Sequence, residues 1–241
     1  KYKEELRETA SQLAAKGKGL LAVDESTPTI GKRLAGINIE NTEENRQAYR
    51  GMLFTAEGLG DYISGVILFE ETLYQKHLDG ESMVSKIHNL GVIPGIKVDK
   101  GLSPLSGGHE LETWCKGLEG LAERTAEYYE QGARFAKWRA VLQITADGCP
   151  TDLAIRENAW GLARYARTCQ DSGLVPIIEP EIPIDIEHKH HFEMLLNESI
   201  KPYLDSFEKH VNDRFDKTLP QVILKLTIPD VPNLYHDLSQ H

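Results

Sequence analysis

Six short runs of apolar and β-branched residues punctuate the chain. They cover residues 19–24, 63–69, 92–98, 134–142, 174–182 and 221–229. Within each run the apolar residues are mostly continuous rather than alternating with polar ones, which is typical of strands covered on both faces. The pattern therefore predicts six buried β-strands.

Segments with a helical period separate these runs. Residues 41–56 open with cap-like Asn and Thr, residues 118–133 follow the third run, and residues 151–173 begin at a Thr and end at a Gly. A regular alternation of strand and helix predicts βαβ units and a parallel sheet. Eight such units do not fit into 241 residues. The residues alone thus leave open an incomplete barrel, a barrel closed by something outside this chain, and an open sheet.

The amino-acid composition argues against several classes of function. The chain has 27 Lys and Arg against 37 Asp and Glu, a formal net charge of −10, so it lacks the basic field that nucleic acid requires. No apolar run approaches the roughly 18 residues of a membrane span. Cys115, Cys149 and Cys169 show no metal or disulfide spacing, which favours a reducing compartment. No targeting segment is visible, and we expect a cytoplasmic location, with the plastid as the alternative.

Charged residues recur at or near the ends of the apolar runs. Because the carboxyl ends of the strands gather on one face of a (β/α) barrel, these charges are expected to converge there. Isolated charges in apolar strands are costly unless they meet one another or a ligand. The residues concerned are Asp24, Glu70, Glu71, Lys97, Asp99, Lys137, Arg139, Glu179, Glu181 and Lys225.

Lys225 is the clearest candidate for chemistry. It lies between VIL and LTI in the sixth run, where loss of solvent lowers the pKa of an amine and favours a neutral nucleophile. A nearby cation such as Lys137 acts in the same direction, and this is a known route to a Schiff-base lysine. The alternative is a structural ion pair with Glu179 or Glu181.

Glu179 and Glu181 are two residues apart and so share one face of their strand. Two close carboxylates cannot both ionise easily, which suits a general acid and base. The alternative is that neighbouring Lys and Arg hold both carboxylates without proton transfer.

A second candidate site follows the first run. Hydroxyls and cations in a loop that opens a helix suit a phosphate monoester, whereas the alternative is an ordinary helix start with exposed cations. The residues are Ser26, Thr29, Lys32 and Arg33. A metal site at His188, His190 and His191 is disfavoured because they have no second cluster at ligand spacing, and we expect neither metal nor cofactor.

Several of these segments together resemble class I fructose-bisphosphate aldolases. The segments are LLAVDEST, ENTEENRQAYR, ISGVILFEETLYQ, IPGIKVDKGL, GARFAKWR, ENAWGLARYA and GLVPIIEPEI, in that family's order and spacing. Residues 1–182 resemble the eukaryotic, plastid-like branch, and residues 183–241 resemble the bacterial class I branch. The family's Ser-Gly-Gly motif after the seventh strand, its Arg-bearing eighth strand and its C-terminal Tyr do not occur in these 241 residues.

The resemblance implies a TIM (β/α)8 barrel, here one domain of residues 1–241, truncated after the sixth βα unit and incomplete at its C-terminus. It implies reversible, metal-independent cleavage of fructose 1,6-bisphosphate to dihydroxyacetone phosphate and glyceraldehyde 3-phosphate, in glycolysis and gluconeogenesis. It also implies a sugar-phosphate substrate and a homo-oligomer. The alternatives are an inactive aldolase-like fragment or scaffold, and a Schiff-base aldolase of transaldolase or deoxyribose-phosphate type.

The resemblance also assigns roles to residues. Lys225 would form the Schiff base, Glu179 with Glu181 beside it would move protons, and Asp24 would take the C4 hydroxyl proton. Lys137 would hold positive charge near the substrate. The residues expected to bind substrate or its phosphate are Ser26, Thr29, Lys32, Arg33, Lys97 and Arg139.

Overall fold

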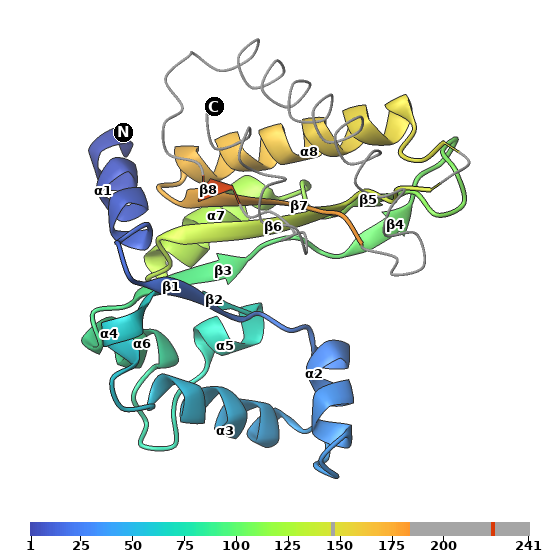
Figure 1. Ribbon diagram of the computed structural model, residues 1–241. Coiled ribbons are helices and arrows are strands. Elements are labelled where there is room, and N and C mark those ends of the chain that lie inside the picture. The colour runs from blue at the N-terminus through green and yellow to red at the C-terminus, as the bar shows by residue number, and fades with distance from the viewer. Residues whose placement is uncertain (146–147, 184–222, 225–241) are drawn as a thin grey trace.

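A six-stranded parallel sheet organises the protein (Figure 1). The computed structural model describes residues 1–145, 148–183 and 223–224. The strand order is β1-β2-β3-β6-β7-β8, and each neighbouring pair is parallel. The strands are β1 (Gly19–Val23), β2 (Ile63–Leu68), β3 (Ile93–Lys97), β6 (Phe135–Val141), β7 (Val175–Glu181) and β8 (Ile223–Leu224).

Helices connect the strands and cover the outer face of the sheet. They are α1 (Lys3–Leu13), α2 (Thr27–Ala35), α3 (Glu43–Phe54), α4 (Leu59–Tyr62), α5 (Glu70–Tyr74), α6 (Met83–Asn89), α7 (Leu121–Glu130) and α8 (Asp152–Asp171). A small antiparallel hairpin of β4 (Leu102–Pro104) and β5 (Thr113–Cys115) follows β3. Among the described residues, no helix is both long enough and apolar enough to span a membrane.

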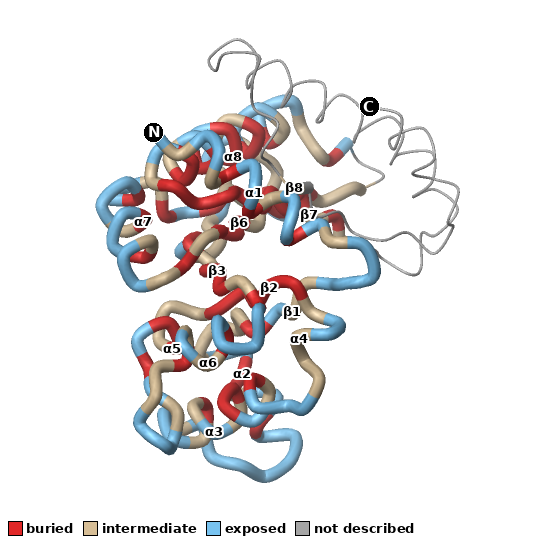
Figure 2. Tube along the Cα trace, turned by 90° about the vertical axis from the view of Figure 1, so that its left-hand side faces the viewer, coloured by how far each residue is buried: buried red, intermediate tan, exposed pale blue. Residues whose placement is uncertain are grey.

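Alternation along each strand separates an outer from an inner face. On β6 the outward residues include Trp138, which is buried and whose ring lies 5.2 Å from that of Tyr165 on α8. On β7 the outward Ile178 belongs to the same large apolar cluster. In Figure 2 most of β2, β3 and β6 is buried, whereas the helices above and below them carry exposed stretches. The apolar runs of β2, β3, β6 and β7 thus lie on mostly buried strands, as predicted, whereas β1 is only partly covered and buries Val23 alone.

The inner face begins with an apolar layer at the amino ends of the strands. Ile67, Phe135 and Ile177 pack there against Leu6 and Leu13 of α1, which covers this end of the sheet. Burial of these side chains supplies the usual hydrophobic stabilisation of about 25 cal/mol per Å². The apolar layer supports the charged residues that follow on the same strands.

Most of the predicted elements are confirmed. Five of the six runs form β1, β2, β3, β6 and β7, and the sixth contributes β8, with residues 221–222 and 225–229 lying outside the described residues. Thr42 and Thr151 cap α3 and α8 by accepting hydrogen bonds from backbone amides three residues on. Gly173, where the third helical segment was expected to end, has a φ of 86°. The chain thus forms part of a TIM barrel, whereas the hairpin β4–β5 was not predicted.

Gly95 provides a direct test of the inner packing. A Cβ at this position would lie 2.3 Å from two ring atoms of Phe135, a fully buried side chain on the neighbouring strand. Gly95→Ala should therefore lower the free energy of unfolding by about 1–3 kcal/mol through overpacking. Gly161→Ala in α8, where nothing lies within 4 Å, is the matched control and should be neutral or stabilising. Equal effects of the two substitutions in urea denaturation would contradict this packing.

Candidate active site

The inner-face charges lie beyond the apolar layer, toward the carboxyl ends of the strands. On β6, Lys137 and Arg139 follow Phe135 at intervals of two residues. On β7, Glu179 and Glu181 pair in register with Arg139 and Val141. The same alternation that buries apolar side chains at one end of each strand therefore places charges together at the other.

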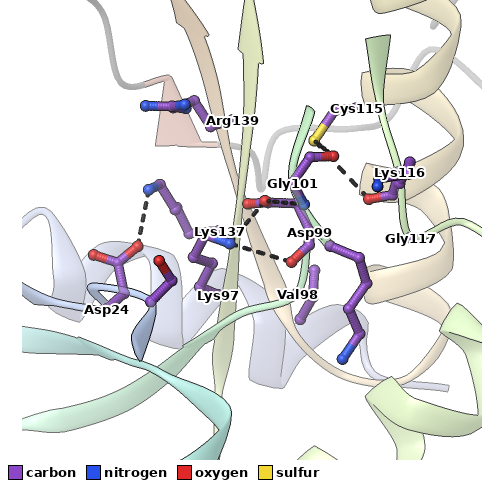
Figure 3. A network of polar contacts seen from close by, with 12 residues as sticks. Asp24, Lys97, Val98, Asp99, Gly101, Cys115, Lys116, Gly117, Lys137 and Arg139 are labelled. Carbon is purple, nitrogen blue, oxygen red and sulfur yellow. Dashed lines mark hydrogen bonds and ion pairs between the residues drawn. The ribbon is translucent and has the colours of Figure 1, made fainter. Parts of the chain in front are cut away.

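The ammonium of Lys137 is the centre of the site. Its Nζ lies 2.9 Å from Asp24 Oδ2 and 2.9 Å from Glu179 Oε2 (Figure 3 shows the contact with Asp24). The three side chains are 8–12% exposed. In a flat sheet β1 and β6 would lie about 14 Å apart, three strand spacings, so this contact requires the sheet to curl. The curled inner face is what brings the ends of β1, β6 and β7 together.

Charge, rather than burial, determines the ionisation of Lys137. Burial alone would lower its pKa, but the carboxylates of Asp24 and Glu179 outweigh this effect, and the pKa is raised from the ordinary 10.5. Lys137 is therefore an ammonium at neutral pH. Because the folded-state pKa is the higher one, this stabilisation is complete below the unfolded value and is lost as pH rises through the folded value.

The remaining inner cations each have a carboxylate partner. Arg139 Nη1 lies 3.4 Å from Glu181 Oε2 in a partly exposed pair. Lys97 Nζ lies 2.7 Å from Asp99 Oδ1, and the Asp99 side chain is only 4% exposed (Figure 3). Glu179 and Glu181 are thus each held by a separate cation, which is the arrangement considered as the alternative to a proton-sharing pair.

The four candidate phosphate-binding residues lie on α2 or at its N-cap: Ser26, Thr29, Lys32 and Arg33. The hydroxyl oxygens of Ser26 and Thr29 lie 3.0 Å apart, within hydrogen-bond distance, at the start of the helix. Lys32 is exposed, and the exposed Arg33 forms an ion pair with Glu25. The structure therefore places these hydroxyls and cations on one short helix next to Asp24, with Arg33 directed to a carboxylate.

Two sets of predicted residues lie outside the described residues. Lys225 is the residue that follows Leu224, the last residue of β8, which pairs with Ile178 of β7. His188, His190 and His191 also lie outside. The role of Lys225 stays a prediction.

Sequence reasoning did not single out a second group of charges beside the site. Arg46 and Arg50 of α3 both contact Glu71, and Arg50 also donates to the backbone oxygen of Glu25. The sequence signals were the position of Glu71 just after the second apolar run and the spacing of the two arginines by four residues, which places them on one face of a helix. Their partners are 21 to 25 residues away, so that spacing could not identify them.

Fold and site together define a (β/α)-barrel protein with a buried lysine and two carboxylates at the carboxyl ends of its strands. Residues 5–211 match the family model described as "Glycolytic: Fructose-bisphosphate aldolase class-I". The chain belongs to the class I fructose-bisphosphate aldolase family.

Individual relatives agree with this assignment. The chain is 60% identical over 187 residues to fructose-bisphosphate aldolase 3, chloroplastic, of Arabidopsis thaliana, covering 78% of this chain and 47% of the relative. It is 59% identical to the chloroplastic aldolase of Spinacia oleracea, with the same shares of both chains. The Plasmodium falciparum aldolase, solved in complex with TRAP and a small-molecule inhibitor, superposes with a TM-score of 0.88 at 51% identity, covering 94% of this chain and 64% of that one. The chain thus spans about half the length of these curated relatives.

Replacing Lys137 tests the central ion cluster. Lys137→Met leaves two mostly buried carboxylates without their shared cation, so we expect a loss of about 3–5 kcal/mol in the free energy of unfolding. Arg139→Met breaks a more exposed and longer pair and should cost at most about 1 kcal/mol. Both losses are measured by urea denaturation at pH 7. Similar losses for the two variants would show that Lys137 does not balance the buried carboxylates.

Proposed function

We propose that the protein to which this chain belongs cleaves fructose 1,6-bisphosphate reversibly into dihydroxyacetone phosphate and glyceraldehyde 3-phosphate, through a Schiff base on Lys225. The observation that carries the proposal is the ammonium of Lys137 held 2.9 Å from both Asp24 and Glu179 at the carboxyl ends of the strands. Family membership supports the substrate and the reaction type.

The first half of the reaction joins the enzyme to the sugar. The neutral amine of Lys225 attacks C2 of the ketose and forms a carbinolamine. The carboxylate of Glu179, with Glu181 two residues along β7, takes the proton that Lys225 gives up in becoming the neutral amine, and then passes it to the C2 hydroxyl, which leaves as water. The product is a protonated imine, whose positive charge draws electrons from the neighbouring bond.

The second half breaks the carbon chain. The carboxylate of Asp24 takes the proton of the C4 hydroxyl, the C3–C4 bond breaks, and its electron pair moves into the iminium to give an enamine. Glyceraldehyde 3-phosphate leaves, C3 of the enamine is protonated, and water hydrolyses the imine to release dihydroxyacetone phosphate and Lys225. Lys137 fits this chemistry because its positive charge lies 2.9 Å from Asp24 Oδ2 and attracts the anionic substrate.

The phosphate groups are assigned to cations and hydroxyls around the same face. Ser26, Thr29, Lys32 and Arg33 occupy or precede α2, where hydroxyls and cations suit a phosphate oxygen. Lys97 and Arg139 lie on β3 and β6 and supply further positive charge. In this proposal Arg33 exchanges its partner Glu25 for phosphate when substrate binds.

Domain organisation, assembly and location are further parts of the proposal. The six parallel strands that the structure describes belong to one sheet, which supports treating residues 1–241 as one barrel domain. A homo-oligomer is proposed from family resemblance, and light scattering of the purified protein would test it. The relatives from Arabidopsis and spinach are chloroplastic, which favours the plastid over the cytoplasm for this protein.

Reductive trapping tests the proposed nucleophile. Borohydride added with dihydroxyacetone phosphate should attach the reduced ligand to Lys225, because hydride converts the imine into a stable secondary amine. Peptide mass spectrometry should place one adduct there, and EDTA should leave its yield unchanged. Lys225→Met should abolish it, whereas Lys3→Met, an exposed position on α1, should keep it.

Three other outcomes of these assays would favour one of the alternative functions. Absence of any adduct in folded protein would support an inactive aldolase-like chain. Loss of cleavage with EDTA would indicate metal chemistry. Turnover of deoxyribose 5-phosphate or a monophosphate, without turnover of the bisphosphate, would indicate one of the other Schiff-base aldolases.

A further inference from the structure

Five charged side chains form a second network behind the loop that follows β1. They come from this loop, α2, α3 and α5, which lie close together on one side of β1 and β2 in Figure 1. The network runs through Arg33, Glu25, Arg50, Glu71 and Arg46. None of the catalytic steps described above uses Arg46, Arg50 or Glu71.

Arg50 is the most deeply buried member, with a fully buried side chain. Its Nη1 lies 3.3 Å from Glu71 Oε1, its Nη2 donates to the backbone oxygen of Glu25 at 2.8 Å, and its guanidinium lies over the ring of Phe69. Burial lowers the pKa of Arg50, although Glu71 and Glu25 oppose this effect. A buried guanidinium is costly, so its position calls for an explanation beyond stability.

The contact with Glu25 explains what Arg50 could control. The Glu25 carbonyl lies one residue beyond Asp24, and neighbouring side chains of an extended chain point to opposite sides. Asp24 turns inward to Lys137, while the buried Glu25 carboxylate pairs with Arg33. Fixing the Glu25 peptide therefore fixes the direction in which Asp24 leaves the backbone.

We propose that Arg50 is a positioning residue whose guanidinium, anchored by Glu71, holds the Glu25 carbonyl and so keeps the Asp24 carboxylate against the Lys137 ammonium. The role of Asp24 in bond cleavage rests on the function proposed above, but the positioning of Asp24 does not. The inference concerns residues that never touch the substrate.

The substitution Arg50→Lys tests the positioning role, because it keeps the positive charge and removes the two Nη donors of the guanidinium. A single ammonium cannot reproduce the planar geometry with which a guanidinium reaches Glu71 and the Glu25 carbonyl together. We expect Asp24 to withdraw and the pKa of Lys137 to fall by about one unit, since a close opposite charge is worth 1–3 units. The pKa is read from 13C NMR of lysine-labelled protein, with the Lys137 signal assigned through Lys137→Arg. The charged partners of Lys137 in this titration are Asp24 and Glu179.

Arg46→Lys is the matched control. Arg46 binds the same Glu71, with contacts as short as 2.6 Å, and is nearly as buried, but its other hydrogen bonds go to Asn41 rather than to Glu25. It should change the pKa of Lys137 by less than about 0.3 units, well below the shift that one close charge produces. An unchanged Lys137 in Arg50→Lys, or equal shifts in both variants, would overturn the proposal.

A second variant and a kinetic readout complete the test. If Arg50→Lys does not fold, Arg50→Gln removes the buried charge and leaves Glu71 paired with Arg46. A fall in the Lys137 pKa then supports the proposal, and no fall overturns it. In active protein, Arg50→Lys should lower kcat by about tenfold or more with little change in KM, because small misplacements of a catalytic group are costly. Absence of turnover in the parent protein would count against the proposed function, whereas the NMR result decides the positioning role.

Discussion

The contact of one ammonium with two carboxylates across a curled sheet is the interaction on which this account depends. Lys137 on β6 meets Asp24, which follows β1, and Glu179 on β7. β1 and β6 are not neighbours in the sheet, so the contact forms only when the strands curve around a common interior. The charges in turn need the contact, since carboxylates with so little exposure are costly without a cation. The curvature of the barrel and the ion pairs of the site therefore depend on each other.

The apolar layer beneath the charges makes this arrangement stable. Phe135 fills the interior because Gly95 on the neighbouring β3 and Gly65 on β2 leave room for its ring, and Leu6 and Leu13 of α1 pack against it. A rigid apolar base limits the movement of Lys137, two residues further along β6 than Phe135. The network around Arg50 does the corresponding work on the opposite side, at the end of β1. The geometry of the site is therefore set by the apolar packing around Phe135 and by the buried ion pairs around Arg50.

Much of the fold could be predicted from sequence because the strands are short, apolar and separated by capped helices. The convergence of charges at the strand ends was predictable for the same reason, since alternation and parallel direction are local properties of the chain. The choice of partners was not. Nothing in the sequence indicates that Glu181 pairs with Arg139 while Glu179 pairs with Lys137, because this depends on curvature.

The elements missed by sequence reasoning share a physical cause. The hairpin of β4 and β5 has three residues in each strand, too few to show a period, and contains Pro104. The helices α4 and α5 are four and five residues long, and their sequences carry no helical pattern. The partners of Arg50 are brought to it by tertiary folding, so only the three-dimensional structure reveals them. Recognising the family motifs supplied roles for residues, but not this supporting network.

A double-mutant cycle between Asp24 and Lys137 measures whether the two side chains interact across the curled sheet. The free energies of unfolding of Asp24→Asn, Lys137→Met and the double variant would be compared with that of the parent chain. The account predicts a coupling of at least about 1 kcal/mol, as expected for charged groups in direct contact. Additive effects, within the roughly 0.3–0.5 kcal/mol found for independent sites, would show that the two side chains do not meet and that the sheet does not curl as described.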